Sequence, residues 1–510
     1  MTTMLVRGKY LIVNHKQVIL NGAVYEEDGR IVAVGPYEEL KEKFRPDNEL
    51  GSDDFLVMPG LVNAHQHGRG LSWFQLGALD DALEPWIHLL WGQHQVDPYW
   101  DTLYNCIQMF ESGVTTTLHS NYSRNPSDWE KEIESSVKAY EDVGIRVAFA
   151  MEIVNKNSFV YKDNQKFVTS LPENLQARIK DLLGDSKALS WEDYFSLFEK
   201  LCKQYQGARG ERVRIFFGPV APQWVSDDVL RNVKRAAAEF GAGIQIHLLE
   251  TMYQKAYALQ TYGKTYVEHL NDLNFLGPEV SCAHCVWPTE KDIDILAGSG
   301  TSVAHNPSSN LRLRDGIAPI VEMITKGVNV GIGTDDASMN DDEDMFQDMR
   351  LALRIHRFPG MDERCPSAAD ILKLGTINGA HICGLEKEIG VLEPGRSADI
   401  VLVKLADILS PHLELSAGIS IIDALVYRAK STDVATVIIK GKVVMKDRKL
   451  MEIDKERVLR ELAASASCPK SSLQNSLGHL MADLRPFAEK VWNELNATAE
   501  SPYYAFNSKI

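Results

Sequence analysis

The sequence predicts an α/β protein: a (β/α)8 TIM barrel with a small composite β-sandwich built from both termini and a helical C-terminal tail. Eight strand-like runs alternate with amphipathic helices between residues 56 and 334, which is typical of parallel α/β architecture. Short β-rich segments occur near both ends of the chain. Apolar residues at helical spacing follow Asp454, which favours a helical tail.

The two ends of the chain have the same texture of short strands and turns. β-Branched and aromatic residues gather in segments that glycine and aspartate separate: 9–13, 22–25 and 30–34 early, then 398–403, 424–427 and 436–444 late. The simplest interpretation is one small β-sandwich that both ends build together, with a larger domain inserted between them.

The inserted domain carries the barrel pattern. Its eight strands are expected at 56–65, 114–119, 146–153, 213–220, 243–248, 279–284, 301–305 and 328–334. In the segment 229–240 the apolar residues fall at i, i+1, i+4, i+7, i+8 and i+11, which predicts an amphipathic helix, and Ser226 is its candidate N-cap. Eight strand–helix units predict a closed barrel, whose active site lies at the carboxyl ends of the strands.

Two further segments lie outside the regular barrel pattern. Residues 154–212 are too long for an ordinary connection and contain an expected helix at 191–205; a lid over the site and a decorative insertion both stay open. The tail is expected to pack on the barrel or on a second subunit. The expected domains are the N-terminal half of the sandwich at residues 1–58, the barrel at 59–389, the C-terminal half of the sandwich at 390–454 and the helical extension at 455–510.

Composition excludes several classes of partner. The chain of 510 residues holds 54 Lys plus Arg against 70 Asp plus Glu, a net charge of −16, which argues against nucleic acid or an anionic membrane as the main partner. Seven thinly spread cysteines are typical of a reducing compartment without a disulfide framework. Residues 1–10 show no signal-peptide pattern, and no run of about 18 apolar residues predicts a transmembrane helix. We therefore expect a cytoplasmic protein that acts on a small molecule.

The most informative segment ends in two histidines that can share one metal ion. His65 and His67 close an apolar run from Pro59, and alternate residues of a strand point the same way. Imidazole nitrogen suits zinc or iron. The matching residues follow in order near the ends of later strand-like runs: His247 and Glu250, His284, His305 and Asp335. A set of this composition at strand ends is hard to produce by accident.

Each residue of this set has an expected role. His247 is expected as the third ligand and Asp335 as the fourth, with Asp335 also placed to take a proton from bound water. A bound metal lowers the pKa of water to about 7, so hydroxide forms at neutral pH. Glu250 is then the expected general acid for the leaving group. His284 is expected to orient the nucleophile or to stabilise oxyanion charge.

Substrate contacts are expected from a polar loop and from aromatic residues in the βα loops. Because tryptophan stacks on flat heteroaromatic rings, three tryptophans join the polar side chains of residues 305–310 in the candidate set: His305, Asn306, Ser308, Asn310, Trp73, Trp86 and Trp224.

In these segments the chain resembles the amidohydrolase superfamily. It is similar to the branch that holds cytosine-, guanine- and S-adenosylhomocysteine-type deaminases and the s-triazine hydrolases such as atrazine chlorohydrolase. The resemblance covers roughly residues 5 to 450 and is carried by the segments 59–67, 247–251, 283–287, 303–310, 333–335 and 390–401.

The resemblance implies one divalent metal ion per chain, held by His65, His67, His247 and Asp335, with zinc as the first expectation and iron as the alternative. Two-metal relatives need a lysine at the end of strand 4, and residues 213–222 contain none. The resemblance also implies a homodimer or a higher homo-oligomer.

Two positions depart from the deaminase pattern. The glycine expected after Asp335 is replaced by Asp336, and an acidic run follows at 341–344. That run either lines the pocket, which would favour a donor-rich or cationic substrate, or lies at the N-terminus of the next helix, where the helix dipole favours it. The second departure is Leu71, which stands where guanine deaminases have a substrate-reading glutamine and argues against a plain guanine deaminase.

The function expected from these observations is metal-dependent hydrolysis of a carbon–nitrogen bond. Deamination of a purine, pyrimidine, pterin or triazine ring is the first expectation, with Glu250 protonating the departing nitrogen. Hydrolysis of an acyclic urea, carbamate or amide is the enzymatic alternative, because only the leaving group differs. A catalytically inactive scaffold is the alternative from another class, and the complete ligand set argues against it.

Overall fold

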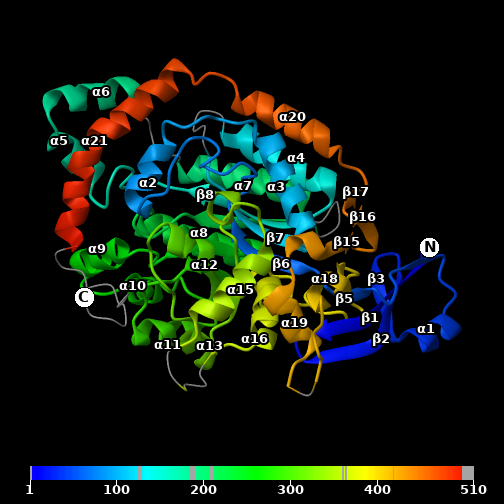
Figure 1. Ribbon diagram of the computed structural model, residues 1–510. Helices are drawn as coiled ribbons and strands as arrows, with labels where there is room; N and C mark the ends of the chain where they lie inside the picture. The colour runs from blue at the N-terminus through cyan, green and yellow to red at the C-terminus, as the bar shows by residue number, and fades with distance from the viewer. Residues whose placement is uncertain are drawn as a thin grey trace.

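The computed structural model describes residues 3–123, 129–183, 190–206, 212–358, 361, 365–416 and 418–496 (Figure 1). Within these residues a sheet of eight strands runs in the order β13-β12-β11-β10-β9-β8-β7-β6, and every neighbouring pair is parallel. The strands are β6 (Leu61–Gln66), β7 (Val114–Ser120), β8 (Arg146–Ile153), β9 (Val213–Pro219), β10 (Ile244–Leu248), β11 (Val280–His284), β12 (Ser302–His305) and β13 (Val330–Ile332). The predicted parallel barrel is confirmed.

The barrel closes where the chain leaves β13. The backbone N–H of Asp335 donates to the carbonyl of His65 at 3.0 Å, which joins the end of the last strand to the first. This contact places a predicted carboxylate ligand directly beside the two histidines of β6. The closure of the barrel is therefore also the first step in assembling the site.

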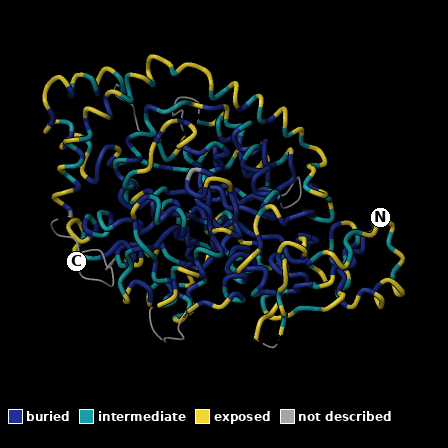
Figure 2. The backbone as a smooth tube through the Cα atoms, viewed as in Figure 1, coloured by how far each residue is buried: buried dark blue, intermediate teal, exposed yellow. Residues whose placement is uncertain are grey.

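Helices surround the barrel because their apolar faces pack on strands that are buried on both sides. They include α3 (Pro98–Glu111), α4 (Trp129–Val143), α7 (Trp191–Tyr205), α8 (Asp227–Phe240), α9 (Met252–Tyr262), α11 (Glu290–Ser299), α15 (Met345–Ile355) and α16 (Ala368–Lys373). Figure 2 shows the buried centre in dark blue and the exposed residues at the rim.

Helices α7 and α8 match the predictions from periodicity. The predicted helix at 191–205 is α7, and α8 contains the predicted 229–240 segment. Helix α8 ends because Gly241 adopts the left-handed conformation at φ 59°. Ser226 precedes α8 but makes no side-chain cap; its hydroxyl accepts a hydrogen bond from Asn155 Nδ2 at 2.9 Å instead.

The terminal segments build a second sheet together. Its order is β17-β16-β15-β14-β5-β1-β2-β3, with β4 paired to β1, and β14 runs antiparallel to β5 where the two ends of the chain meet. Its strands are β1 (Thr3–Asn14), β2 (Gln17–Glu27), β3 (Arg30–Pro36), β4 (Asn48–Leu50), β5 (Phe55–Pro59), β14 (Ile400–Lys404), β15 (Val434–Ile439), β16 (Lys442–Lys446) and β17 (Lys449–Leu450).

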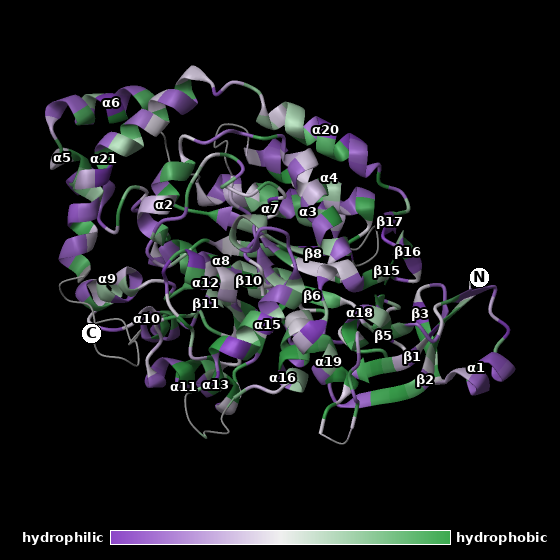
Figure 3. Cartoon of the chain, in the orientation of Figure 1, coloured by the Kyte–Doolittle hydropathy of each residue, from purple (hydrophilic) through white to green (hydrophobic). Residues whose placement is uncertain are grey.

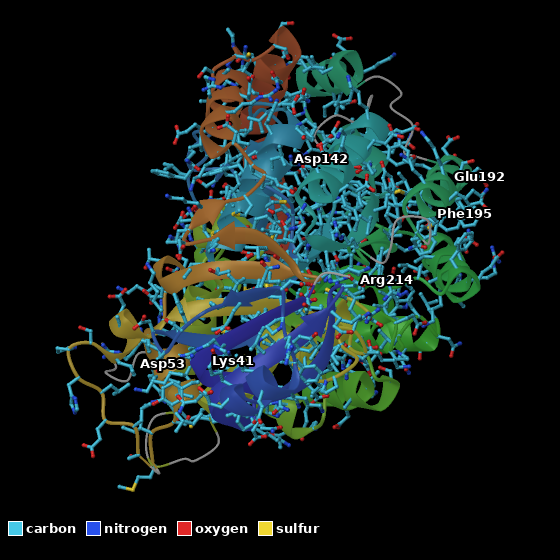
Figure 4. The ribbon with its side chains drawn as sticks, turned by 90° about the vertical axis from the view of Figure 1, so that its right-hand side faces the viewer. Lys41, Asp53, Asp142, Glu192, Phe195 and Arg214 are labelled. Atoms are coloured by element: carbon cyan, nitrogen blue, oxygen red, sulfur yellow. The ribbon has the colours of Figure 1, made fainter. Side chains whose placement is uncertain are left out.

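Figure 4 shows the blue N-terminal strands and the orange C-terminal strands side by side in this sheet. The strands are coloured mostly as hydrophobic in Figure 3, and they enclose a separate apolar cluster that includes Val24, Ile400 and Ile438. The prediction that both termini build one β unit is confirmed.

Three local predictions differ from the structure. The expected strand 56–65 is two strands, because Pro59 lacks a donor and Gly60 turns away to donate to the carbonyl of Asp399 at 3.0 Å. The expected strand 436–444 is the hairpin β15–β16, which turns at Lys440 and Gly441 with φ of 50° and 74°.

The prediction of a strand at 424–427 is wrong, because this segment lies within the helix α19 (Ile421–Arg428). Ser420 and Asp423 form a capping box: the Asp423 N–H donates to the Ser420 hydroxyl, and the Ser420 N–H donates to the Asp423 carboxylate. The capping box and the burial of the apolar side chains of Ile421 and Leu425 outweigh the β propensity of the segment.

The long insertion and the tail pack on each other outside the barrel. The insertion contributes α5 (Asn164–Thr169) and α6 (Glu173–Leu183), and the tail contributes α20 (Lys455–Ala466) and α21 (Ser472–Asn496). Helix α21 contacts α2 (Leu83–Leu90), α6 and α9, while α20 lies against α3, as Figure 1 shows in red and orange. The last predicted tail residues, 497–510, lie outside the described residues. Among the helices that are described, none is long and apolar enough to span a membrane.

Candidate metal centre and active site

The predicted metal ligands come from the carboxyl ends of three barrel strands and the turns that follow them. His65 is the second-last residue of β6 with His67 just beyond the strand, His247 lies in β10, and Asp335 follows β13. Asp335 has a left-handed backbone with φ of 66°, a conformation that costs a non-glycine residue about 1–3 kcal/mol. The surrounding barrel holds this turn, and the turn aims the carboxylate at the histidines.

The four side chains form one compact cluster. His65 Nε2 and His67 Nε2 lie 2.9 and 3.2 Å from Oδ1 of Asp335. The ring centroids of His65 and His247 are 4.9 Å apart, and the rings of His67 and His247 stack at 5.4 Å with an interplanar angle of 2°. Residues that are far apart in sequence thus present three imidazoles and one carboxylate to a common point.

Hydrogen bonds on the far side of each ring orient the imidazoles. His67 Nδ1 donates to the Ser120 carbonyl at 2.7 Å, and His247 Nδ1 donates to the Val220 carbonyl at 2.8 Å. A carbonyl can only accept, so each Nδ1 carries the proton and each Nε2 presents a lone pair to the centre. His65 Nδ1 lies 3.1 Å from Oε1 of Gln245, which fixes the third ring in the same sense.

The cluster fits a divalent metal ion. His65 Nε2 and Asp335 Oδ1 are buried 2.9 Å apart, and neither has a hydrogen-bond partner among the described residues. One ligand atom each of His65, His67 and Asp335 lies within 4.8 Å of the others, and the same holds for His65, His247 and His284. Three imidazole nitrogens and a carboxylate oxygen suit zinc and iron.

The charge state of Asp335 is the one that a metal ligand needs. Burial by itself would raise the pKa of Asp335, but the imidazoles of His65 and His67 hold that pKa well below its ordinary value. The hydroxyl of Ser309 donates to Oδ2 of Asp335 at 2.5 Å, which leaves Oδ1 directed at the histidines. Asp335 therefore stands as an oriented carboxylate anion.

Glu250 and His284 lie side by side next to this cluster. Glu250 Oε1 is 3.5 Å from Nε2 of His284, and both residues are buried. Gln254 holds Glu250 by donating to Oε2 at 3.5 Å and by accepting from its backbone N–H at 3.0 Å. Burial, followed by the charges of Asp335 and Glu84, raises the pKa of Glu250 well above its ordinary value. A buried carboxyl with a raised pKa is equipped to carry a proton at neutral pH.

His284 is held as a neutral imidazole. Its Nδ1 lies 2.9 Å from Oδ1 of Asn310 and 3.4 Å from Nδ2 of Asn306. Burial lowers the pKa of His284 to about 4, so the ring carries no charge at neutral pH. The ring centroids of His65 and His284 are 5.5 Å apart, which places His284 at the edge of the ligand cluster.

The structure divides the four predicted polar substrate contacts into two pairs. Asn306 and Asn310 reach His284 and therefore the centre of the site. His305 Nε2 lies 3.0 Å from Nε2 of His356, and the Ser308 hydroxyl donates to Asp348 at 2.6 Å, so both side chains engage α15 and its C-terminal end.

The predicted tryptophans occupy two apolar clusters of the βα loops. Trp73 and Trp86 meet edge to face with centroids 6.2 Å apart and pack with Leu313 and Met339. Trp224 packs against Tyr161 of the insertion at 6.1 Å.

Several residues that support the site were not predicted. Gln245 stands two residues before His247 on the same face of β10, and that alternation was the available signal. Ser309 lies inside the polar segment from which Ser308 was chosen. Glu343 is fully buried behind the site, where it accepts hydrogen bonds from Thr334 at 2.5 Å and Asn105 at 2.9 Å.

The acidic run at 341–344 does not line the pocket, because its side chains are engaged elsewhere. Asp344 caps α15 by accepting from the N–H groups of Phe346 and Gln347, as the interpretation based on the helix terminus predicts. Asp341 pairs with Arg312 at 2.9 Å at the surface.

This barrel, with three imidazoles and a carboxylate at its strand ends, is the architecture of a metal-dependent hydrolase. Residues 56–444 match the model of the amidohydrolase family, and the chain belongs to that family. It is 31% identical over 473 residues to a 5'-deoxyadenosine deaminase of Methanosarcina mazei, with 91% of this chain and 98% of the relative covered. It is 34% identical over 450 residues to a 5-methylthioadenosine/S-adenosylhomocysteine deaminase of Desulfitobacterium hafniense, covering 87% of this chain and 93% of the relative.

Solved structures give the same fold. A zinc-bound adenosine deaminase from Xanthomonas campestris has a TM-score of 0.77 and 25% identity, with 91% of this chain and 98% of that chain covered. An atrazine chlorohydrolase from Arthrobacter aurescens has a TM-score of 0.77 and 21% identity, covering 91% and 100% of the two chains. The resemblance that the sequence motifs indicate is thus confirmed.

Proposed function

We propose that this protein hydrolyses a carbon–nitrogen bond and deaminates an amino-substituted nitrogen heterocycle. The observation that carries the proposal is the buried pair of Glu250 and His284, whose side chains lie 3.5 Å apart beside the oriented cluster of His65, His67, His247 and Asp335. This arrangement supplies a ligand set, a proton carrier and a neutral hydrogen-bonding group at one point.

The proposed ligands are His65, His67, His247 and Asp335, holding one divalent ion per chain. Zinc is the first choice because the adenosine deaminase from Xanthomonas campestris has bound zinc, and iron is the alternative since it accepts the same donor set. A bound ion of this kind acidifies a water molecule and polarises the atom that is attacked.

Each remaining side chain has a proton or an orientation to provide. Asp335, fixed by Ser309, accepts a proton from the attacking water. Glu250 delivers a proton to the departing nitrogen. His284, kept neutral with its Nδ1 proton directed at Oδ1 of Asn310, presents the lone pair of Nε2 and orients the attacking water.

The substrate is proposed by analogy with the relatives. Deaminases of 5'-deoxyadenosine, 5-methylthioadenosine and S-adenosylhomocysteine cover most of this chain at 31–34% identity. Adenine-type nucleosides are therefore the first compounds to test, followed by pyrimidines, pterins and triazines. Release of an amine from an acyclic urea, carbamate or amide is the alternative, and an inactive scaffold is disfavoured because the ligand set is complete.

The test is elemental analysis of protein purified without added metal, followed by an ammonia-release screen on the same sample. One zinc or iron per chain with ammonia from a heterocyclic amine supports the proposal. Metal with larger amines released from ureas, carbamates or amides supports the alternative. A protein that binds no metal after reconstitution and turns over nothing refutes both.

The domain limits near residues 58, 389 and 454, the homodimeric or higher assembly and the cytoplasmic location stay predictions.

A further inference from the structure

Three buried acidic side chains lie beside the proposed metal centre, one from a helix and two from loops. Glu84 lies in α2, Glu250 follows β10, and Asp315 follows α12 (Pro307–Arg312); they are 3%, 4% and 2% exposed. One ligand atom each of Glu250, His284 and Asp315 lies within 4.8 Å of the others. Glu84 joins them through Thr251, the residue after Glu250, whose hydroxyl donates a hydrogen bond to Oε1 of Glu84.

Asp315 has a fixed backbone and an unpaired side chain. Its N–H donates to the carbonyl of Asn310 at 2.8 Å, and its own carbonyl accepts from Trp287 Nε1 at 2.7 Å. In the described segments of the chain, neither carboxylate oxygen has a hydrogen-bond partner. Asn310 also contacts Nδ1 of His284, so the same residue positions both Asp315 and the imidazole of His284, which Asp315 faces.

Only one carboxylate oxygen of Glu84 has hydrogen-bond partners in the same pocket. Its Oε1 accepts from the hydroxyl of Tyr161 at 3.0 Å and from the hydroxyl of Thr251. Its Oε2 is buried and has no partner among the residues described. Tyr161 belongs to the long insertion, so the insertion helps to build this side of the site.

No basic side chain neutralises these acids within the described ranges. The arginines of the loop that carries Asp315 turn away: Arg312 pairs with Asp80 at 2.8 Å, and Arg314 approaches Asp81 at 3.6 Å. A buried carboxylate without a hydrogen bond or a counter-charge is unfavourable by several kcal/mol. The pocket therefore matches a ligand that brings N–H donors and positive charge with it.

We propose that Asp315, assisted by Glu84, accepts N–H donors from the substrate, so that the ring acted on carries a second amino group or a guanidine-type edge beside the carbon that loses ammonia. A carboxylate accepts two parallel N–H bonds from an N–C–N unit. Adenine presents a C–H at the corresponding ring edge and cannot make these bonds. This inference rests on the proposed deamination and narrows its substrate class to diamino- or guanidine-type heterocycles.

The test compares substrates that differ by one amino group on the metal-loaded, full-length protein. Adenosine is paired with 2,6-diaminopurine riboside, and 4-aminopyrimidine with 2,4-diaminopyrimidine, and kcat/KM is measured from ammonia release. The wild type should favour the diamino compound of a pair by about 10- to 100-fold, the range of a charge-assisted hydrogen bond. Asp315→Asn should abolish this preference, so that the ratio of the two kcat/KM values within a pair falls to about 1.

Matched variants and controls separate recognition from folding. Glu84→Gln should lower the preference to a smaller extent, because Oε1 of Glu84 is already occupied. Asp80→Asn changes an exposed acid that pairs with Arg312 of the same loop and should leave the preference intact. Asp315→Asn should bind one metal ion and unfold at the wild-type temperature or above, because the amide needs no counter-charge.

Binding of 2,4-diaminopyrimidine and 4-aminopyrimidine is measured by calorimetry on the same samples, so that the subsite is tested even without turnover. Diamino binding that depends on Asp315 without ammonia release would refute deamination and keep the subsite. Ammonia release with no effect of Asp315→Asn on either ratio would overturn the subsite and keep deamination. A second metal ion that Asp315→Asn removes would also overturn it, by making Asp315 a ligand.

Discussion

Replacing Glu250 by glutamine removes the proposed proton carrier while preserving almost all of the surrounding structure. Glutamine has the same shape, and Gln254 can still contact it through the bonds that now hold Oε2 and the backbone N–H. Glu250 is absent from the cluster of His65, His67 and Asp335, so metal content should stay at the wild-type value. The change therefore isolates the transfer of the proton.

The expected loss follows from the size of that step. General acid catalysis contributes about 10²- to 10⁴-fold to a rate, so kcat should fall by that factor, which corresponds to about 3–5 kcal/mol in the barrier. Steady-state ammonia release, metal analysis and the unfolding temperature are measured together, with the exposed Glu452→Gln as the matched control. Near-normal turnover in Glu250→Gln with metal bound would refute the assigned role, and loss of metal would show that Glu250 is a ligand.

Three further changes test the ligand set, the barrel and a buried histidine. His247→Ala should lose tightly bound metal and all turnover, as elemental analysis of the purified variant will show. In the wild type the buried Asp399 lies 2.7 Å from the guanidinium of Arg146, and Arg146→Met leaves this carboxylate without its charged partner. The free energy of unfolding measured by urea titration should fall by about 3–5 kcal/mol, while the metal content stays unchanged. Burial lowers the pKa of His356 from 6.5 to about 4, so as the pH falls the unfolded chain takes up a proton before the folded chain does, and folding loses stability between about pH 6.5 and 4. The free energy of unfolding of His356→Gln should therefore fall less than that of the wild type over that range. Equal slopes of unfolding free energy against pH in the two proteins would contradict the argument.

The prediction of the barrel succeeded because its signal is repeated along the chain. Buried parallel strands read as short apolar runs, and each amphipathic helix repeats a period that survives small errors in its limits. The prediction at 424–427 failed because the segment is short, and a capping pair at Ser420 and Asp423 decided its conformation. The break at Pro59–Gly60 was missed because both flanking strands are apolar and only pairing assigns them to different sheets.

The candidate site was likewise predicted where the residue type is specific and missed where only tertiary contacts identify the residue. His65, His67 and His247 were found because their residue type is specific and they stand at strand ends in order. Gln245, Ser309 and the acid pair of Glu84 and Asp315 were not found. Glutamine, serine and acidic residues are common in loops, so only distances to the centre distinguish them from surface residues.

The sequence by itself determined the fold class, the family, the composition of the proposed metal-binding set and the two helices α7 and α8, because each depends on residue type and on local spacing. Only the tertiary structure decided which acids share the pocket. Asp315 reaches Glu250 and His284 from a loop far away in sequence, and Glu84 reaches the neighbouring Thr251 from α2. The acidic run at 341–344 instead supplies a helix cap, a surface ion pair and a buried hydrogen-bond acceptor. The physical reason is that burial and the direction of a carboxylate depend on how the barrel closes, and no local pattern records that.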